Sequence, residues 1–270
     1  MARAAVVFGA TGRLGRVMLQ SLSDLGVEAI AVTRPVLTKH IATGALPALP
    51  EHIMLIDASV DYAHLRQHEA DKHTLIAALA QRTRIELVAA FSSGATDFDD
   101  ALITNPSYLE YKRVKEQNLV FFQSLGARLF YPKIYTLIGP NSYGLKTIGW
   151  VSVLDQALRA GEVSIAHPNE LRSWVSERAI RTLFAAFVAA DHPDYLDAPV
   201  CGTFCLADIV GFCEVRRGCR LAIKPGQAAG WLQVPYVAPR PTQVGNDRNL
   251  QAELESLLDS AASNSGTRGK

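Results

Sequence analysis

The sequence predicts an α/β protein in which a parallel sheet is covered by helices. Over the first 135 residues, short apolar segments alternate with helical patterns, which is typical of successive βα units. A glycine-rich turn, GATGRLG, lies between the first apolar segment and the first helical pattern. The apolar segments are four to eight residues long, the length of buried strands rather than of helices.

The first half of the chain divides into regular elements. Residues 35–50 contain proline, glycine and threonine, and we expect mostly loop there, with room for one short helix. A third β-unit, if present, is therefore compressed. The expected strands are residues 4–8, 27–32, 52–56, 85–91 and 127–131, and the expected helices are residues 14–25, 68–80 and 105–125.

From residue 134 onward the pattern is less regular. We expect a first domain formed by residues 1–133, with residues 174–200 packing back onto it. Residues 134–173 and 201–260 then form a smaller C-terminal lobe, and the small polar residues 261–270 form a disordered tail. Within the second half the expected elements are helices at residues 148–160, 177–190 and 250–258 and a strand at residues 163–166.

Composition excludes several functional classes. The chain has 49% hydrophobic residues, too many for overall disorder, and its 27 Lys+Arg and 26 Asp+Glu give a net charge of +1. That balance provides no field to attract nucleic acid or an anionic membrane. Since no apolar run approaches the roughly 18–20 residues of a membrane span, we expect a cytoplasmic protein.

Four cysteines lie within nineteen residues, at Cys201, Cys205, Cys213 and Cys219. Their spacing lacks the C-x2-C pairs of common zinc sites, and no histidine lies among them. The pattern favours buried thiols over a metal site or a disulfide, and we predict no metal.

The glycine turn has the spacing G-x-x-G-x-x-G. Such a turn lacks side chains where the backbone bends sharply and where a pyrophosphate would approach, and the following helix offers its N–H groups to the anion. The sequence therefore predicts a dinucleotide site. The predicted contacts in this turn are Gly9, Thr11, Gly12, Arg13, Leu14 and Gly15.

The end of the second expected strand indicates which dinucleotide is bound. Many NAD-binding folds place a carboxylate there for the ribose, but this chain has Val32, Thr33 and Arg34. Because Arg34 and Arg13 can contact a 2′-phosphate, we expect NADP(H) to be favoured over NAD(H). The alternative is that both arginines are solvated surface residues.

The helix predicted from residue 105 contains two overlapping Y-x-x-x-K pairs, Tyr108/Lys112 and Tyr111/Lys115. Each pair lies on one helix face, and Tyr111 is the closer of the two tyrosines to the expected apolar stripe. A phenol with a pKa of ~10 becomes a usable acid or base beside an ammonium group. A hydroxyl at a strand end, from Ser92 or Ser93, can hold the substrate oxygen.

The combined motifs resemble the extended short-chain dehydrogenases/reductases, the superfamily of NAD(P)-dependent epimerases, dehydratases and ketoreductases. The resemblance rests on GATGRLG, FSSGATDF and YLEYKRVKEQ, the last similar to the family's Y-x-x-x-K-x-x-x-E-Q helix. It implies a Rossmann-like doubly wound sheet, with Tyr108 as proton donor and Lys112 as its partner. Ser93 is the implied carbonyl-orienting hydroxyl, with Ser92 and Thr96 as alternatives.

Two further segments extend the resemblance. YPKIY and IGP are similar to the family's R-P-x-x-V-Y-G-P segment, which implies that Pro132 and Ile134 border the nicotinamide; Tyr131 replaces the arginine. LRSWV is similar to R-x-F/W-V, which implies that Arg172 contacts a substrate phosphate. In related enzymes the tyrosine-bearing helix often packs in a dimer interface, so a homodimer is also implied.

One βα unit of the family pattern is missing. HIMLIDASVDY resembles the family's fourth strand and the loop beneath the cofactor, which implies that Asp57, Ala58 and Ser59 lie along the cofactor. Alternatively this segment is the third strand, with Asp57 contacting adenine, and the fourth strand is lost. We favour the first interpretation.

The sequence thus predicts an NADP(H)-dependent oxidoreductase that reduces a carbonyl, or oxidises a secondary alcohol, of a small molecule. By resemblance alone, the substrate is a 4-keto sugar nucleotide. One alternative is an NAD(P)-dependent sugar-nucleotide epimerase or dehydratase. Another is a non-catalytic, NADP-sensing regulatory protein.

Overall fold

The computed structural model describes most of the chain. The described residues are 4–44, 48–140, 162–165, 167–190, 193–218, 220, 222–225, 232, 234–244 and 251–256. The predicted helix at residues 148–160, the predicted tail at 261–270 and Cys219 lie outside them.

The chain divides into two compact units. The first consists of Met1–Thr96, Glu110–Lys133 and Arg181–Asp197. The second consists of Asp97–Leu109, Ile134–Ile180 and Ala198–Lys270.

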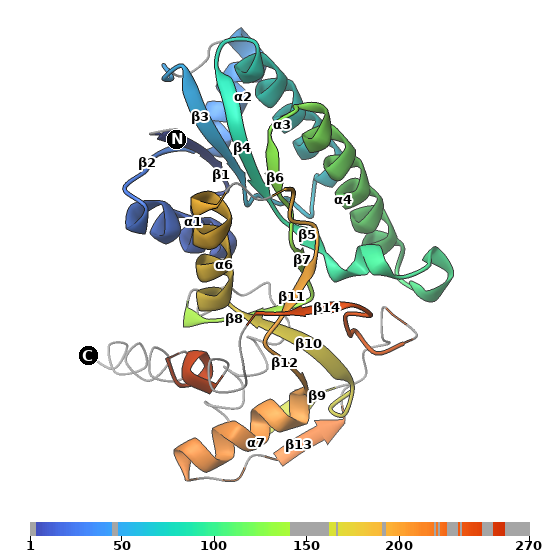
Figure 1. Ribbon diagram of the computed structural model, residues 1–270. Helices are drawn as coiled ribbons and strands as arrows, with labels where there is room; N and C mark the ends of the chain where they lie inside the picture. Colours follow the sequence, from blue (N-terminus) through green and yellow to red (C-terminus); the bar gives the residue numbers. More distant parts are fainter. Residues whose placement is uncertain are drawn as a thin grey trace, which may run out of the picture. The chain divides into compact units, whose positions relative to one another are not determined.

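The first unit contains a five-stranded parallel sheet with the order β2-β1-β3-β4-β6, which confirms the predicted fold class (Figure 1). Every strand is largely apolar, as expected where helices cover both faces of a parallel sheet. The strands are β1 (Ala4–Phe8), β2 (Glu28–Val32), β3 (His52–Asp57), β4 (Arg84–Ala90) and β6 (Arg128–Phe130).

The position of β3 decides between the two interpretations of HIMLID. This strand pairs with β1 on the side opposite to β2, with Val6 beside Leu55. That is the place of the family's fourth strand, so the strand assignment in the favoured interpretation is confirmed. The chain goes from β1 to β2 and then returns past β1 to β3, so the order of the strands reverses between β1 and β3. Folds of this type bind ligands at such a reversal, beside the carboxyl ends of the strands.

Helices cover both faces of this sheet (Figure 1). Helix α1 (Arg13–Asp24) lies on one face, and α2 (Arg34–Thr43), α3 (Leu65–Ala80) and α4 (Pro106–Ser124) lie on the other. The core between the sheet and the second group of helices includes Val6, Leu55, Leu75, Val88 and Phe122.

The segment after β2 is less loop-like than predicted. Helix α2 has ten residues and begins directly at Arg34, with Leu37 N donating to Thr33 O at 3.0 Å. Pro35 suggested a loop, but proline is tolerated in the first turn of a helix, where its missing N–H has no helical acceptor.

The second unit contains several small sheets, and its Trp174 is fully buried and donates from Nε1 to Phe204 O at 3.0 Å. Its three-stranded sheet has the order β12-β10-β8, and β11 pairs with β14 and β13 with β9. Here and in the connecting segments the elements are β5 (Ser92–Ser93), η1 (Gly94–Asp97), η2 (Asp100–Leu102), β7 (Lys133–Ile134), β8 (Thr136–Ile138), β9 (Glu162–Ile165), β10 (Leu171–Ser176), α6 (Glu177–Ala189), β11 (Ala198–Val200), β12 (Gly202–Cys205), α7 (Leu206–Arg217), β13 (Ala222–Pro225), β14 (Pro241–Gln243) and a helical turn at residues 251–256.

Three of the four cysteines are described, and the prediction that they are buried thiols is confirmed for these three. Cys201, Cys205 and Cys213 are buried and not in disulfides. Within the described ranges, no group of three or more His, Cys, Asp or Glu side chains is placed to hold a metal ion. None of the helices in the described part combines the length and apolarity that crossing a membrane requires.

Candidate functional site

The glycine turn is held tightly against the loop that follows β3. Gly9 has φ +73°, and a Cβ atom there would lie 2.7 Å from backbone atoms of Ala58 and Ser59. A Cβ atom on Gly15 would lie 2.0 Å from Gly9 O. Since ordinary Cβ contacts are longer than 3 Å, both positions require glycine if the turn is to keep this packing.

Gly12 has a different role, because its surroundings are open. It is the N-cap of α1, its N–H donates to Gly9 O at 2.9 Å, and an added Cβ would meet only Gly9 O at 3.2 Å and Ala58 O at 4.0 Å. No side chain caps α1, and its first turn has no acidic residue. The N–H groups of this turn can therefore bind an anion, which fits the pyrophosphate of a dinucleotide. Beside Gly12, Thr11 is exposed, Arg13 is buried and Leu14 is half-buried.

The residues Asp57, Glu69 and Lys72 form a buried charge cluster beneath the same loop. Lys72 Nζ lies 2.7 Å from Asp57 Oδ2 and 2.9 Å from Glu69 Oε1. Asn118 Nδ2, from α4, donates to Glu69 Oε2 at 2.8 Å. Because each carboxylate has a partner, the cost of burying the charges is offset.

This cluster fixes the loop Asp57–Ser59. Asp57 Oδ1 accepts from Ser59 Oγ at 2.8 Å and from Ser59 N at 3.2 Å, and Lys72 Nζ donates to Ser59 O at 3.4 Å. Burial opposes ionisation of Asp57, but the charges of Lys72 and Lys115, with hydrogen bonds from Lys72 and Ser59, bring the pKa below its ordinary value. Ionised Asp57 therefore holds the loop against which Gly9 packs.

Sequence reasoning missed Lys72 and Glu69. The available signal was their position on α3, where they share the helix face of Leu65, Leu75, Ile76 and Leu79. Charged residues on an apolar face are rarely buried unless they are paired.

The two Tyr/Lys pairs of α4 have different environments. Tyr108 is 39% exposed, and Lys112, which is buried, has its Nζ 3.6 Å from Glu116 Oε1. Lys115 Nζ lies 5.5 Å from the centroid of the Tyr111 ring, and its charge contributes to lowering the pKa of Asp57. The Tyr111/Lys115 pair therefore adjoins the buried charge cluster.

Tyr131, which replaces the family's arginine, links two elements at the carboxyl edge of the sheet. Its hydroxyl donates to Lys115 O at 2.7 Å and is hydrogen-bonded by the Ser92 side chain. Burial, and then the nearby charge of Asp57, raise the pKa of Tyr131, so it remains a neutral phenol.

Ser92 and Ser93 are both buried and differ in their contacts. Ser92 N donates to the carbonyl of Pro132, which is also buried. Ser93 Oγ accepts from Ala95 N at 3.2 Å, and its carbonyl accepts from Thr96 Oγ1 at 2.8 Å. The hydroxyl of Thr96 is thus engaged within the turn that follows β5.

Arg34 is already paired. Its Nη2 lies 2.6 Å from Asp61 Oδ2, in the segment that links β3 to α3. The basic end of β2 that the sequence predicts is therefore an ion pair, contributed by two segments 27 residues apart.

The remaining predicted residues belong to the second unit. Ile134 is half-buried, and Arg172 Nη2 lies 3.2 Å from Glu170 Oε1. In the same unit Tyr135 donates its hydroxyl to Asp97 Oδ2 at 2.7 Å, and its ring lies 4.7 Å from that of Tyr236.

The structure therefore brings together two sets of predicted residues. Gly9 lies against Ala58 and Ser59, and Ser92 N donates to Pro132 O. Arg34 is paired with Asp61 instead of standing alone.

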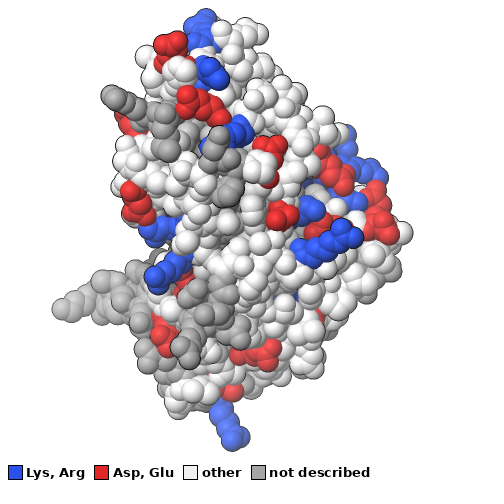
Figure 2. Space-filling view, in the orientation of Figure 1, with Lys and Arg blue, Asp and Glu red and all other residues white. Residues whose placement is uncertain are grey.

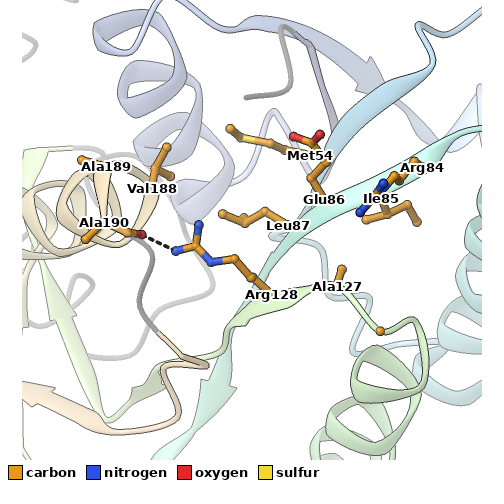
Figure 3. A pocket seen from close by; sticks show the side chains of 11 residues that line it. Met54, Arg84, Ile85, Glu86, Leu87, Ala127, Arg128, Val188, Ala189 and Ala190 are labelled. Carbon is orange, nitrogen blue, oxygen red and sulfur yellow. Dashed lines mark hydrogen bonds between the residues drawn. The ribbon is translucent and has the colours of Figure 1, made fainter.

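A cavity of about 520 Å³ lies elsewhere in the first unit, where β4 and β6 begin (Figure 3). Met54, Glu86 and Leu87 line it from the sheet, opposite Val188 and Ala189 of α6. Arg128 also lines it and donates from Nη2 to Ala190 O at 2.6 Å, capping α6. Since this cavity is at the amino ends of the strands, it is not the place where parallel α/β sheets bind dinucleotides.

Surface charge agrees with the balanced composition. On the face that Figure 2 shows, Lys and Arg side chains of the described residues are interspersed with Asp and Glu. Such a distribution provides no extended field of one sign on that face.

The chain has the doubly wound fold of the extended short-chain dehydrogenases/reductases. No protein-family model matches the sequence, and a search of curated proteins finds no match. Among solved structures it is similar to TunA, an NAD-dependent NDP-hexosamine 5,6-dehydratase involved in tunicamycin biosynthesis, with 12% identity, a TM-score of 0.70, and coverage of 97% of this chain and 98% of TunA.

Two further structures share the fold. UDP-glucuronic acid 4-epimerase from Bacillus cereus, in complex with UDP-glucuronic acid and NAD, is 12% identical with a TM-score of 0.67, over 96% of this chain and 99% of the epimerase. RMD from Pseudomonas aeruginosa, complexed with NADPH, is 15% identical with a TM-score of 0.67, over 97% of this chain and 100% of RMD.

Proposed function

We propose that this protein is an NADP(H)-dependent oxidoreductase that reduces a carbonyl group, or oxidises a secondary alcohol, of a sugar nucleotide. The observation that carries the proposal is the close packing of the Gly9–Gly15 turn against the Asp57–Ser59 loop. This contact lies between β1 and β3, where the order of the strands reverses. No side chain caps the N-terminus of α1, so its backbone N–H groups can bind a pyrophosphate. In this proposal the first unit is the dinucleotide-binding domain and the second is the substrate-binding lobe.

In this proposal the residues that take part in the reaction lie on α4 and after the end of β4. A bound nicotinamide supplies or accepts the hydride. Tyr108 donates the proton to the developing alkoxide, and Lys112, one turn along the same helix, stabilises the phenolate that remains. Ser93 holds the carbonyl oxygen, with Ser92 and Thr96 as the alternative hydroxyls.

The half-exposed position of Tyr108 supports this assignment over Tyr111. A proton donor must reach the substrate, and Tyr108 is 39% exposed. Tyr111 lies beside Lys115 and has its ring 5.4 Å from that of Tyr62, so it belongs to the packing around the buried charge cluster.

Arg34 and Arg13 support NADP(H) as the preferred dinucleotide. Neither Thr33 nor Arg34 is acidic, so the end of β2 itself contributes no carboxylate to repel a 2′-phosphate. Arg34 is 70% exposed and can turn toward a phosphate. Pro132 and Ile134 border the nicotinamide in this proposal.

The substrate class is proposed from fold similarity. Solved structures with this fold include one named for a complex with UDP-glucose and NAD and one for a complex with UDP-glucuronic acid and NAD. Arg172, in the second unit, is the proposed contact for the substrate's phosphate.

An NAD-dependent epimerase or dehydratase is the second candidate. The Arg34–Asp61 ion pair favours it, because Asp61 already occupies the guanidinium that a 2′-phosphate would need. Such an enzyme returns the hydride to its product and keeps the dinucleotide bound through the cycle.

Two measurements on the purified protein separate these candidates. The first is the identity of any dinucleotide released on denaturation, and the second is NADPH oxidation with a panel of 4-keto and other keto sugar nucleotides. Released NADP(H), or none, with substrate-dependent NADPH oxidation supports the reductase. Released NAD with isomerised or dehydrated sugar nucleotide supports the second candidate, and dinucleotide binding without turnover of any sugar nucleotide contradicts both.

A further inference from the structure

The first unit places a carboxylate beside the end of β2 that does not come from β2. Asp61 lies between β3 and α3, and its Oδ2 lies 2.6 Å from Arg34 Nη2. Parallel α/β folds that bind dinucleotides read the adenosine ribose from the residues that follow this strand. Arg34 is one of those residues. Because Asp61 contacts Arg34, its carboxylate is also within reach of the proposed position of the adenosine ribose.

Asp61 is the more firmly held member of this pair. Its side chain is only 14% exposed, compared with 70% for Arg34. Its Oδ1 accepts from Ala63 N at 3.1 Å, and His64 Nδ1 lies 3.5 Å from its Oδ2. The loop thus fixes the carboxylate, while the guanidinium comes to it from solvent.

The carboxylate is charged at neutral pH. Burial alone would raise the pKa of Asp61, but the hydrogen bond from Ala63 N and the positive charge of Arg34 bring it below its ordinary value. An anion that approaches Arg34 therefore meets the negative charge of Asp61 beside the exposed positive charge of the guanidinium.

This arrangement has opposite effects on the two dinucleotides. A 2′-phosphate must share or displace the Arg34 contact and lie near the Asp61 carboxylate, which repels it. A ribose that carries a 2′-hydroxyl has no such repulsion and can donate a hydrogen bond to a carboxylate.

We propose that Asp61 is a specificity-determining residue, which weakens binding of NADP(H) relative to NAD(H) by holding Arg34 and repelling the 2′-phosphate. The inference rests on the proposed dinucleotide site. It supplies the acidic group that the sequence lacks at the end of β2, from a segment on the other side of β1.

The test is titration of the full-length protein with NADPH and with NADH, followed by calorimetry, for wild type and Asp61→Asn. The amide keeps the size of the side chain and the oxygen that accepts from Ala63 N. We expect the NADPH dissociation constant to fall about tenfold, the scale of one charge-assisted contact, and that of NADH to stay within about twofold or rise.

A matched control removes a carboxylate from an equivalent ion pair. Asp24, at the end of α1 away from the glycine turn, pairs with Arg181. Asp24→Asn changes the net charge equally and should leave both dissociation constants within about twofold. In Arg34→Gln the further change Asp61→Asn should have a smaller effect on NADPH, because the guanidinium is already gone.

The outcomes are distinguishable. If wild type binds both dinucleotides and Asp61→Asn leaves their ratio unchanged, or strengthens both equally, Asp61 does not determine specificity although the dinucleotide site stands. If neither wild type nor Asp61→Asn binds either dinucleotide, the proposed function itself is contradicted.

Discussion

Lys72 and Asp57 form an ion pair at 2.7 Å, in which neither side chain is more than 2% exposed. The lysine comes from α3 and the aspartate from the carboxyl end of β3, so the pair joins a helix to the edge of the sheet that carries the glycine turn. A charged pair that is closed to solvent is costly to break, and its breakage changes the loop that supports Gly9.

Lys72→Met should be among the most destabilising substitutions in the first unit. It leaves Asp57 and Glu69 buried without their shared cation, which costs about 3–5 kcal/mol of the free energy of unfolding. Urea denaturation monitored by circular dichroism measures this loss in the free energy of unfolding. Lys39→Met, an exposed lysine on α2, is the control and should stay within about 0.5 kcal/mol of wild type. Equal denaturation midpoints for the two variants would show that the buried pair contributes little.

Asp57→Asn should make stability less dependent on pH in the acid range. The pKa of Asp57 is lower in the folded protein than its ordinary value of about 3.9. Its contribution is therefore present above that ordinary value and is lost as the pH falls through the lower folded pKa. We expect the variant to be less stable than wild type at pH 7, with the difference narrowing toward pH 3. Parallel stability curves between pH 7 and pH 3 would contradict this assignment of charge.

Gly12→Ala should weaken dinucleotide binding more than it weakens the fold. The new methyl group needs only a small displacement of Gly9 O, and it lies at the N-cap of α1, where the proposed pyrophosphate would approach. We expect the NADPH dissociation constant to rise at least about tenfold. Gly211→Ala in α7 is the matched control, because nothing lies within 4 Å of its added Cβ. It should leave affinity unchanged and stabilise by up to about 1 kcal/mol. Equal affinities for the two variants would place the pyrophosphate elsewhere.

Much of the first unit could be predicted from the sequence, because its strands and helices are local patterns. The strands β1, β2, β3, β4 and β6 lie within a few residues of the predicted ranges, and HIMLID takes the place of the fourth strand, as the favoured interpretation predicts. The two-residue strand β5 is not predicted. Helix α2 was underestimated because Pro35 was interpreted as a loop residue.

The contacts that define the candidate site were harder to predict, since they join distant parts of the chain. Asn118 binds Glu69 across 49 residues and Arg34 binds Asp61 across 27. In neither pair does the local sequence around one residue indicate which residue it contacts. The glycine turn was predictable, because sharp bends and close backbone approach require residues without side chains.

The most direct test of the proposed function is hydride transfer from NADPH deuterated at C4 to a 4-keto sugar nucleotide, followed by mass spectrometry of the product. Tyr108→Phe is compared with Tyr111→Phe, which removes the same hydroxyl one helical turn away. We predict label transfer by wild type, about 10²- to 10⁴-fold slower transfer by Tyr108→Phe with unchanged NADPH affinity, and less than about threefold slowing by Tyr111→Phe. Wild-type rates in Tyr108→Phe would contradict the assignment of Tyr108 as the proton donor.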